Sequence, residues 1–158
     1  MTKEMKQVFT RRITQANRTQ LVVIVYEMLL VYLDEAASAY QKGDTAEFGR
    51  SLQFARDCIG NLRENLNFSY GISKNLFAIY NFADRELASN ISGNRAENLN
   101  AIRIIFKKLL KAFQNVSKKD NSAPLMDNIQ SVYAGLTYNK KTINESLVSS
   151  DVQRGYLV

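Results

Sequence analysis

The segment at residues 21–33, LVVIVYEMLLVYL, most constrains the fold, because Glu27 is its only residue that is not apolar. A helix that packs against a single core needs an apolar stripe of only about 100° or slightly more. A membrane span needs about 20 predominantly apolar residues. This run is shorter and has Arg18 and Asp34 near its ends. We therefore expect a bundle helix that is apolar on all sides and has a spare face.

The composition removes several classes of function. The chain has 158 residues, which fits one domain, and it contains no histidine and a single cysteine, Cys58. The commonest general base, a zinc site and an internal disulfide therefore have no residues to form them. No GxxxxGK(S/T) or GxGxxG run is present. We expect no catalytic residues, no cofactor, no metal and no enzyme.

The N-terminal residues MTKEMKQVFTRR lack the apolar stretch and cleavage site of a secretory signal. A lone cysteine in an apolar helical pattern is typical of a reduced, buried thiol. Both observations favour a cytoplasmic protein.

Helix start and stop signals divide the chain. Two capping-box signatures, Asn17 with Gln20 and Asp44 with Glu47, open the first two helices, and Gly43 ends the first. The second helix carries a heptad seam of apolar residues, namely Phe48, Leu52, Ala55, Ile59, Leu62 and Leu66. A third helix follows at residues 72–87.

Asn94 with Glu97 is expected to open the fourth helix, which fades near Lys119. Its apolar seam has the same 3- and 4-residue spacing, in Leu99, Ile102, Phe106, Leu109, Phe113 and Val116. Because the connections are short, consecutive helices should be antiparallel neighbours. We predict an all-α, antiparallel up-down four-helix bundle over 17–119, with a short N-terminal arm or helix at 1–16 and a partly irregular C-terminal tail at 120–158. A non-bundle all-α fold is the alternative.

The fourth helix also carries charge. Seven basic residues stand against Glu97 alone between residues 94 and 119, so this segment has a net charge of +6, equal to that of the whole chain. Arg103, Lys107 and Lys111 follow at i, i+4 and form a basic stripe. Such a stripe fits phosphates or an acidic protein surface. No aromatic residues alternate with the basic ones, as single-strand binding would require, so a solvated helix face is favoured and a nucleic-acid partner is not.

Three groups of residues occur in an order and spacing that match a known family pattern. In the family pattern, the first long helix opens with Thr-Ala-Ser-Pro-Glu-Gln-Leu and continues with an apolar run that contains Leu-Tyr-Asp. The residues of this chain that match that pattern form the first group and are Ile13, Ala16, Gln20, Leu21, Tyr26 and Glu27. The others are Gly43 with Asp44, and Asn75, Leu76, Tyr80, Arg85 and Leu87. Over about residues 8–117 the chain resembles the FliS-type family of flagellin-specific export chaperones. Asn17 and Arg18 replace the Ser-Pro pair, and Val8 and Phe9 replace an N-terminal tyrosine.

The resemblance implies a cytoplasmic chaperone that binds the disordered C-terminal segment of flagellin, prevents premature polymerisation and aids export. The implied partners are flagellin, in a one-to-one complex, and the flagellar export machinery. Two alternatives stay open, a basic nucleic-acid-binding bundle and a structural or interaction bundle. A homodimer without client is also compatible with the spare face.

We predict that the spare face of the first long helix joins the third helix in a client-binding groove. Its residues are Ile13, Val22, Val25, Leu29, Tyr32, Ile72, Leu76 and Tyr80. Ordinary core positions are the alternative, since helical spacing does not separate core from groove. The apolar chain ends are further predicted to cover the groove in the absence of client, through Val8, Phe9 and Ile13 or through Tyr133, Leu136 and Tyr138.

Overall fold

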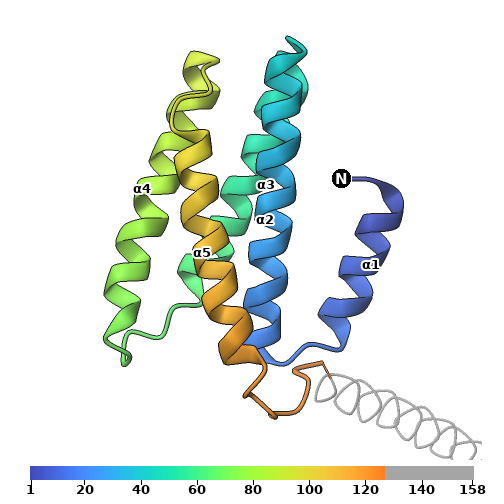
Figure 1. Cartoon of the computed structure of the whole chain (residues 1–158), viewed down its shortest axis with the longest axis vertical. Helices are drawn as coiled ribbons and strands as arrows, with labels where there is room; N and C mark the ends of the chain where they lie inside the picture. Colours follow the sequence, from blue (N-terminus) through green and yellow to red (C-terminus); the bar gives the residue numbers. More distant parts are fainter. Residues whose placement is uncertain (127–158) are drawn as a thin grey trace, which may run out of the picture.

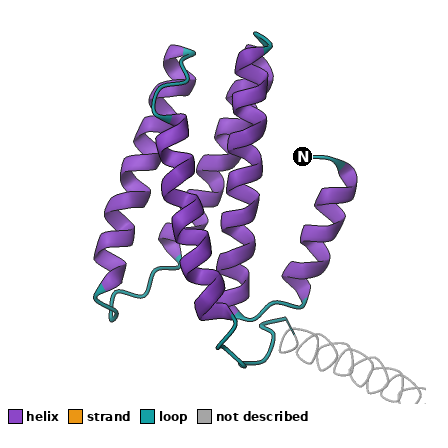
Figure 2. Ribbon diagram, in the orientation of Figure 1, coloured by secondary structure: helices purple, strands orange, loops and turns teal. Residues whose placement is uncertain are grey.

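A computed structural model describes residues 1–126, and every regular element in that range is a helix. In chain order these are α1 (Lys3–Thr14), α2 (Arg18–Gln41), α3 (Thr45–Glu64), α4 (Ile72–Gly93) and α5 (Leu99–Ser117). Helices α2 to α5 form an antiparallel up-down bundle, and α1 lies alongside α2 (Figures 1 and 2). The predicted bundle is confirmed.

The bundle helices pack side by side in the order α5, α2, α3 and α4. Helix α2 packs against α3 and α5, and α3 packs against α4. The core between the four helices contains residues from each of them, including Leu33, Leu52, Leu87 and Ile102, all at most 2% exposed. Cys58 is also buried, and burial raises the pKa of its thiol to about 12. A thiol with that pKa stays protonated and unreactive.

The predicted N-caps of α2 and α3 are confirmed, but the full capping box forms at α2 and not at α3, where the Asp44 amide donates to the Ala39 carbonyl instead. The Asn17 side chain accepts from the Gln20 amide at 2.9 Å, and the Gln20 side chain accepts from the Asn17 amide at 3.0 Å. The Asp44 carboxylate accepts from the Glu47 amide at 2.9 Å. Gly43 has φ +72, a left-handed conformation that a residue without Cβ adopts freely. The connection between α2 and α3 is therefore short, and the two helices pack antiparallel.

The predicted start of the last bundle helix is wrong. Helix α4 continues to Gly93, Asn94 ends it with φ 45, and α5 begins only at Leu99. The buried Asn90 side chain determines this boundary. It donates to the Glu97 carbonyl at 2.8 Å and accepts from the Glu97 amide at 3.2 Å. Because Asn90 holds this backbone in a loop, Glu97 does not enter a helix at that point.

Residues 1–16, predicted as an arm or short helix, contain α1. Phe9 and Ala16 are buried against Ile24 of α2, and Arg12 pairs with Glu27 at 2.5 Å. Other apolar residues of the N-terminal segment and of α2 pack around them, namely Met1, Met5, Ile13, Leu21, Met28 and Val31. Helix α2 therefore has two apolar contacts, the bundle core on one side and α1 on the other, as its composition predicted.

Residues 120–126 cross the start of α2. The Asn17 side chain donates to the carbonyls of Asp120 and Ser122, at 3.2 and 3.3 Å, and the Leu125 amide donates to the Ala16 carbonyl at 3.0 Å. The rest of the predicted tail, with Tyr133, Leu136 and Tyr138, lies outside the described residues.

Candidate client-binding groove

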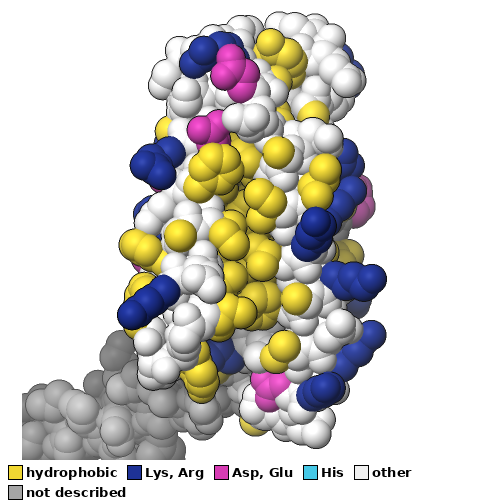
Figure 3. All heavy atoms as spheres, turned by 60° about the vertical axis from the view of Figure 1, so that its left-hand side comes forward, with side chains coloured by type: hydrophobic (Ala, Val, Ile, Leu, Met, Phe, Trp, Pro, Cys, Tyr) yellow, Lys and Arg dark blue, Asp and Glu magenta, His cyan; other side chains and the backbone are white. Residues whose placement is uncertain are grey.

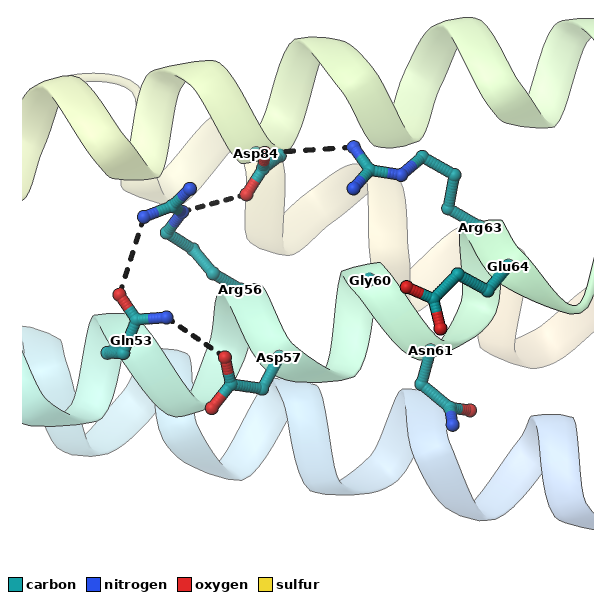
Figure 4. A pocket seen from close by; sticks show the side chains of 8 residues that line it. All are labelled: Gln53, Arg56, Asp57, Gly60, Asn61, Arg63, Glu64 and Asp84. Carbon is teal, nitrogen blue, oxygen red and sulfur yellow. Dashed lines mark hydrogen bonds and ion pairs between the residues drawn. The ribbon is translucent and has the colours of Figure 1, made fainter.

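The flank of α4 that faces α3 is polar and closed by ion pairs. Arg56 of α3 donates through Nε to Asp84 of α4 at 2.7 Å, and Arg63 lies 3.8 Å from the same carboxylate. Arg63 also donates to Asn81 at 3.1 Å. Figure 4 shows both arginines reaching Asp84 across a polar hollow that includes Gly60. These contacts leave the opposite flank of α4 facing α5.

The flank of α5 that faces α2 is marked by Arg103, whose Nε lies 2.7 Å from the Asp34 carboxylate of α2. Successive residues of a helix are about 100° apart. The free flanks of α4 and α5 therefore face each other, and each carries a row of apolar residues, with Glu86 on the α4 flank seven positions after Ile79. We call this surface the α4–α5 groove, with Ile72, Leu76, Ile79, Ile105, Leu109 and Val116 as its lining.

The α4–α5 groove is open to solvent. In the described part of the chain, the backbones of α4 and α5 lie further apart along their lengths than those of α2 and α3. Ile72 is 62% exposed and Val116 is 52% exposed. Figure 3 shows a continuous apolar strip that runs between the two helices along the long axis of the bundle. Beneath it, the rings of Tyr80 and Phe106 stack with centroids 6.3 Å apart. The result is an elongated apolar groove above a layer of buried aromatic rings.

The structure distributes the eight predicted site residues over several places. Leu29, Leu76 and Tyr80 lie in the main core, each at most 4% exposed. The Tyr80 hydroxyl hydrogen-bonds the Tyr26 hydroxyl, and burial raises the pKa of both phenols. Leu76 forms the buried side of the α4–α5 groove, next to the exposed Ile72.

The remaining predicted residues lie on other surfaces. Val22 and Val25 are half-buried against the main core, and Ile13 is half-buried between α1 and α2. Tyr32 packs against Phe54 of α3 with ring centroids 5.2 Å apart, and burial raises its pKa. The eight residues therefore do not form one continuous surface.

Sequence reasoning missed four residues of the α4–α5 groove as site residues. Ile79, Leu109 and Val116 belong to the periodic seams, where they are indistinguishable from core positions. Ile105 lies outside the seam of α5 and is nevertheless apolar. An apolar residue one position away from a seam was the available signal that this helix has a second apolar contact.

Other kinds of site find no support in the described part of the chain. Between residues 1 and 126, no three His, Cys, Asp or Glu side chains are arranged to hold a metal ion. No helix of the same range is long and apolar enough to cross a membrane. The polar hollow on α3 and α4 has a volume of about 410 Å³, and its arginines are already paired with Asp84.

One comparison with known proteins gave a match, and it covers the whole helical region. A family model described as "Flagellar protein FliS" matches residues 1–120, which include α1 to α5. No curated protein was found to match the chain. The family match extends over well more than half of the sequence and over every helix that builds the groove. The chain therefore belongs to the flagellar protein FliS family, whose members are flagellar export chaperones.

Proposed function

We propose that this chain binds the disordered C-terminal segment of flagellin in the cytoplasm, in a one-to-one complex that prevents premature polymerisation before export. The protein acts by binding and not by catalysis, and it passes its client to the export machinery. Membership of a chaperone family favours this function over the nucleic-acid-binding and structural alternatives. The observation that carries the proposal is the open α4–α5 groove.

The dimensions of the α4–α5 groove suit a helical client. Helix α4 has 22 residues, which corresponds to a length of about 33 Å. A client helix of similar length presents several apolar side chains on one face. Ordering a disordered segment costs about 2–5 kcal/mol or more, so binding requires extended apolar contact. A groove that runs along the bundle supplies that contact, whereas a single small pocket does not.

The predicted residues on α1 and α2 stay part of the proposal as a second contact. Val22, Val25 and Tyr32 are half-buried beside the bundle, and Ile13 lies where α1 covers α2. A client that wraps around the bundle reaches them only after leaving the α4–α5 groove. We therefore assign the larger part of the binding free energy to the groove.

Calorimetric titration of the purified chain with the C-terminal segment of its own organism's flagellin tests the proposal. We expect one-to-one binding by the wild type and a loss of about 30-fold or more in Ile72→Glu and in Val116→Glu, since the loss of an apolar anchor at an interface costs about 2 kcal/mol or more. Both side chains are exposed, so the variants should fold, which circular dichroism confirms. Asn61→Glu in the polar hollow is the matched control and should bind like the wild type.

Each result has a definite meaning. Absence of binding by the wild type would contradict flagellin as the client. Binding that survives both groove variants but is lost in Val25→Glu would move the site to α2 and α3. A stable homodimer on gel filtration that Ile72→Glu dissociates would assign the α4–α5 groove to a second copy instead.

A further inference from the structure

Helix α5 differs in chemistry between its two flanks. Successive residues of a helix are about 100° apart, so Lys107, Lys111 and Lys118 lie within about 80° of Arg103, on its outer side. The residues of α5 that line the α4–α5 groove lie about 120–160° from Arg103 in the opposite direction. All three lysines are exposed. We call Lys107, Lys111 and Lys118 the basic flank, and it points away from the groove.

The carboxylates beside the basic flank do not neutralise it. All three carboxylates of α2 are already paired: Asp34 with Arg103 at 2.7 Å, and Glu27 and Glu35 with groups of the N-terminal segment. Asp120, which follows α5, accepts from a threonine hydroxyl of α2 at 2.6 Å and from a backbone amide at 2.9 Å. Within residues 1–126 no ion pair involves a lysine of the basic flank. Its positive charge therefore stays available to a partner.

A hollow at the end of the basic flank makes the neighbouring surface concave. The hollow has a volume of about 330 Å³ and is lined by residues of α1, α2 and α5, among them Arg12, Gln20 and Ser117. Lys118 follows Ser117 directly, so the basic flank runs toward this hollow. A convex element of a partner, such as a helix, therefore meets both positive charge and a complementary shape between α1 and α5.

We infer that the basic flank docks an acidic helix on the surface of a second protein, distinct from the client. The row of lysines is about 17 Å long, which corresponds to three turns of a partner helix. No aromatic residue lies between the lysines to stack on bases, so the flank suits carboxylates better than single-stranded nucleic acid. A second copy of this chain carries a net charge of +6 and is disfavoured by repulsion.

The position of the basic flank has a consequence for assembly. Client in the α4–α5 groove contacts one flank of α5, and the second protein contacts the other. Neither covers the surface that the other needs, so both can be bound at the same time. The inference thus goes beyond the proposed function, because it adds a second docking surface that a loaded chaperone keeps exposed.

The test uses two synthetic helical peptides of identical composition. One carries its Glu residues in a single row at spacings of four and seven residues, which match those of the lysines, and the other has them distributed around the helix. Fluorescence anisotropy measures their binding to the full chain and to two triple variants, K107Q/K111Q/K118Q in the basic flank and K6Q/K42Q/K74Q at exposed lysines elsewhere. Both variants lose the same charge.

At about 0.05 M salt we expect the row peptide to bind the wild type about fivefold more tightly than the distributed peptide. The basic-flank variant should lose this preference and bind the row peptide about fivefold more weakly, and the control variant should stay within about twofold of the wild type. At about 0.5 M salt the differences should largely disappear, since exposed charges are then screened over a few Å.

A second arm adds the flagellin C-terminal peptide at saturating concentration. The row peptide should then bind with unchanged affinity, and the basic-flank variant should bind the flagellin peptide like the wild type. Equal binding of the two Glu peptides, or equal losses in the two triple variants, would overturn the inference. Displacement of the row peptide by the flagellin peptide would overturn it as well, as would tighter binding of a single-stranded oligonucleotide than of the row peptide at the same salt.

Discussion

The two flanks of α4 differ in chemistry. Toward α3, Asp84 receives Arg56 and approaches Arg63, and the seam is polar and closed. Toward α5, the flank is apolar and open, and no ion pair joins α4 to α5 within residues 1–126. Helix α4 therefore has one flank that is closed by ion pairs to α3 and one flank that is open to solvent beside α5.

The difference shows how a small bundle keeps an apolar surface exposed without falling apart. Beneath the α4–α5 groove, the Phe106 ring lies 5.9 Å from Tyr26 and 6.3 Å from Tyr80, and Phe113 lies 5.4 Å from Tyr26. Aromatic burial stabilises α5 from the inside and uses none of the outer surface. Ion pairs hold α4 to α3 at the surface. The apolar residues above the aromatic rings therefore stay available to a partner.

Phe106→Ala should have the largest effect on stability. Removing a fully buried aromatic ring costs about 3–5 kcal/mol, through lost burial and a cavity. The destabilisation should be largest around α5, since the ring packs against Tyr26 of α2 and Tyr80 of α4. Urea denaturation measures the free energy of unfolding, and hydrogen exchange should rise most in α5. A decrease in the free energy of unfolding of less than about 1 kcal/mol would contradict the stabilising role given to the buried aromatic layer.

Alkaline pH should destabilise the same buried aromatic layer through the phenols of Tyr26 and Tyr80. Burial raises the pKa of both phenols above 10.0, so they remain neutral in the folded state while those of the unfolded chain ionise. The unfolded state then binds fewer protons, and stability falls as the pH rises above about 10. Between pH 9 and pH 11 these two tyrosines should lower the free energy of unfolding by about 2 kcal/mol. A Tyr26→Phe/Tyr80→Phe variant should lose correspondingly less over that range, and an unchanged pH profile would contradict the assignment.

Asp84→Ala tests the closed flank and should have a moderate effect. The carboxylate and both arginines are partly exposed, so removing the pairs should cost about 1–2 kcal/mol. Client affinity should not change, because this flank faces away from the α4–α5 groove. Glu97→Ala, which removes the more exposed pair with Arg95, is the control and should cost less. Weakened client binding in folded Asp84→Ala would show that the two flanks are coupled.

Local rules predicted the bundle but not all its boundaries. The caps at Asn17 and Asp44 depend on residues three positions away, so they are readable in the sequence. The start of α5 depends on Asn90, a buried side chain that holds the loop at Glu97 and that no local rule identifies. For the same reason, Asn94 was misread as the start of a helix when it ends one.

The site was harder to predict than the fold. Leu76 and Ile79 follow the same helical period, yet one is buried and the other faces the α4–α5 groove. Tyr80 was predicted as a groove residue, but its hydroxyl meets Tyr26, 54 positions away, in the core. Which apolar residue remains accessible depends on how far apart two helices pack, and periodicity carries no information on that distance.

Deleting residues 1–12 should have the smallest effect and decides whether the α4–α5 groove acts alone. Most of α1 would be lost, and Ile24, Met28 and Val31 of α2 would be uncovered. If the client also uses that face, α1 competes with it, and the truncation should tighten binding by about fivefold, because the competent state becomes more populated. Calorimetry with the flagellin peptide measures this, after gel filtration has verified that the exposed face does not cause aggregation. Deleting 124–158 is the parallel test of the other chain end. If both truncated chains bind with the affinity of the full chain, neither end covers a client contact, and the α4–α5 groove accounts for binding alone.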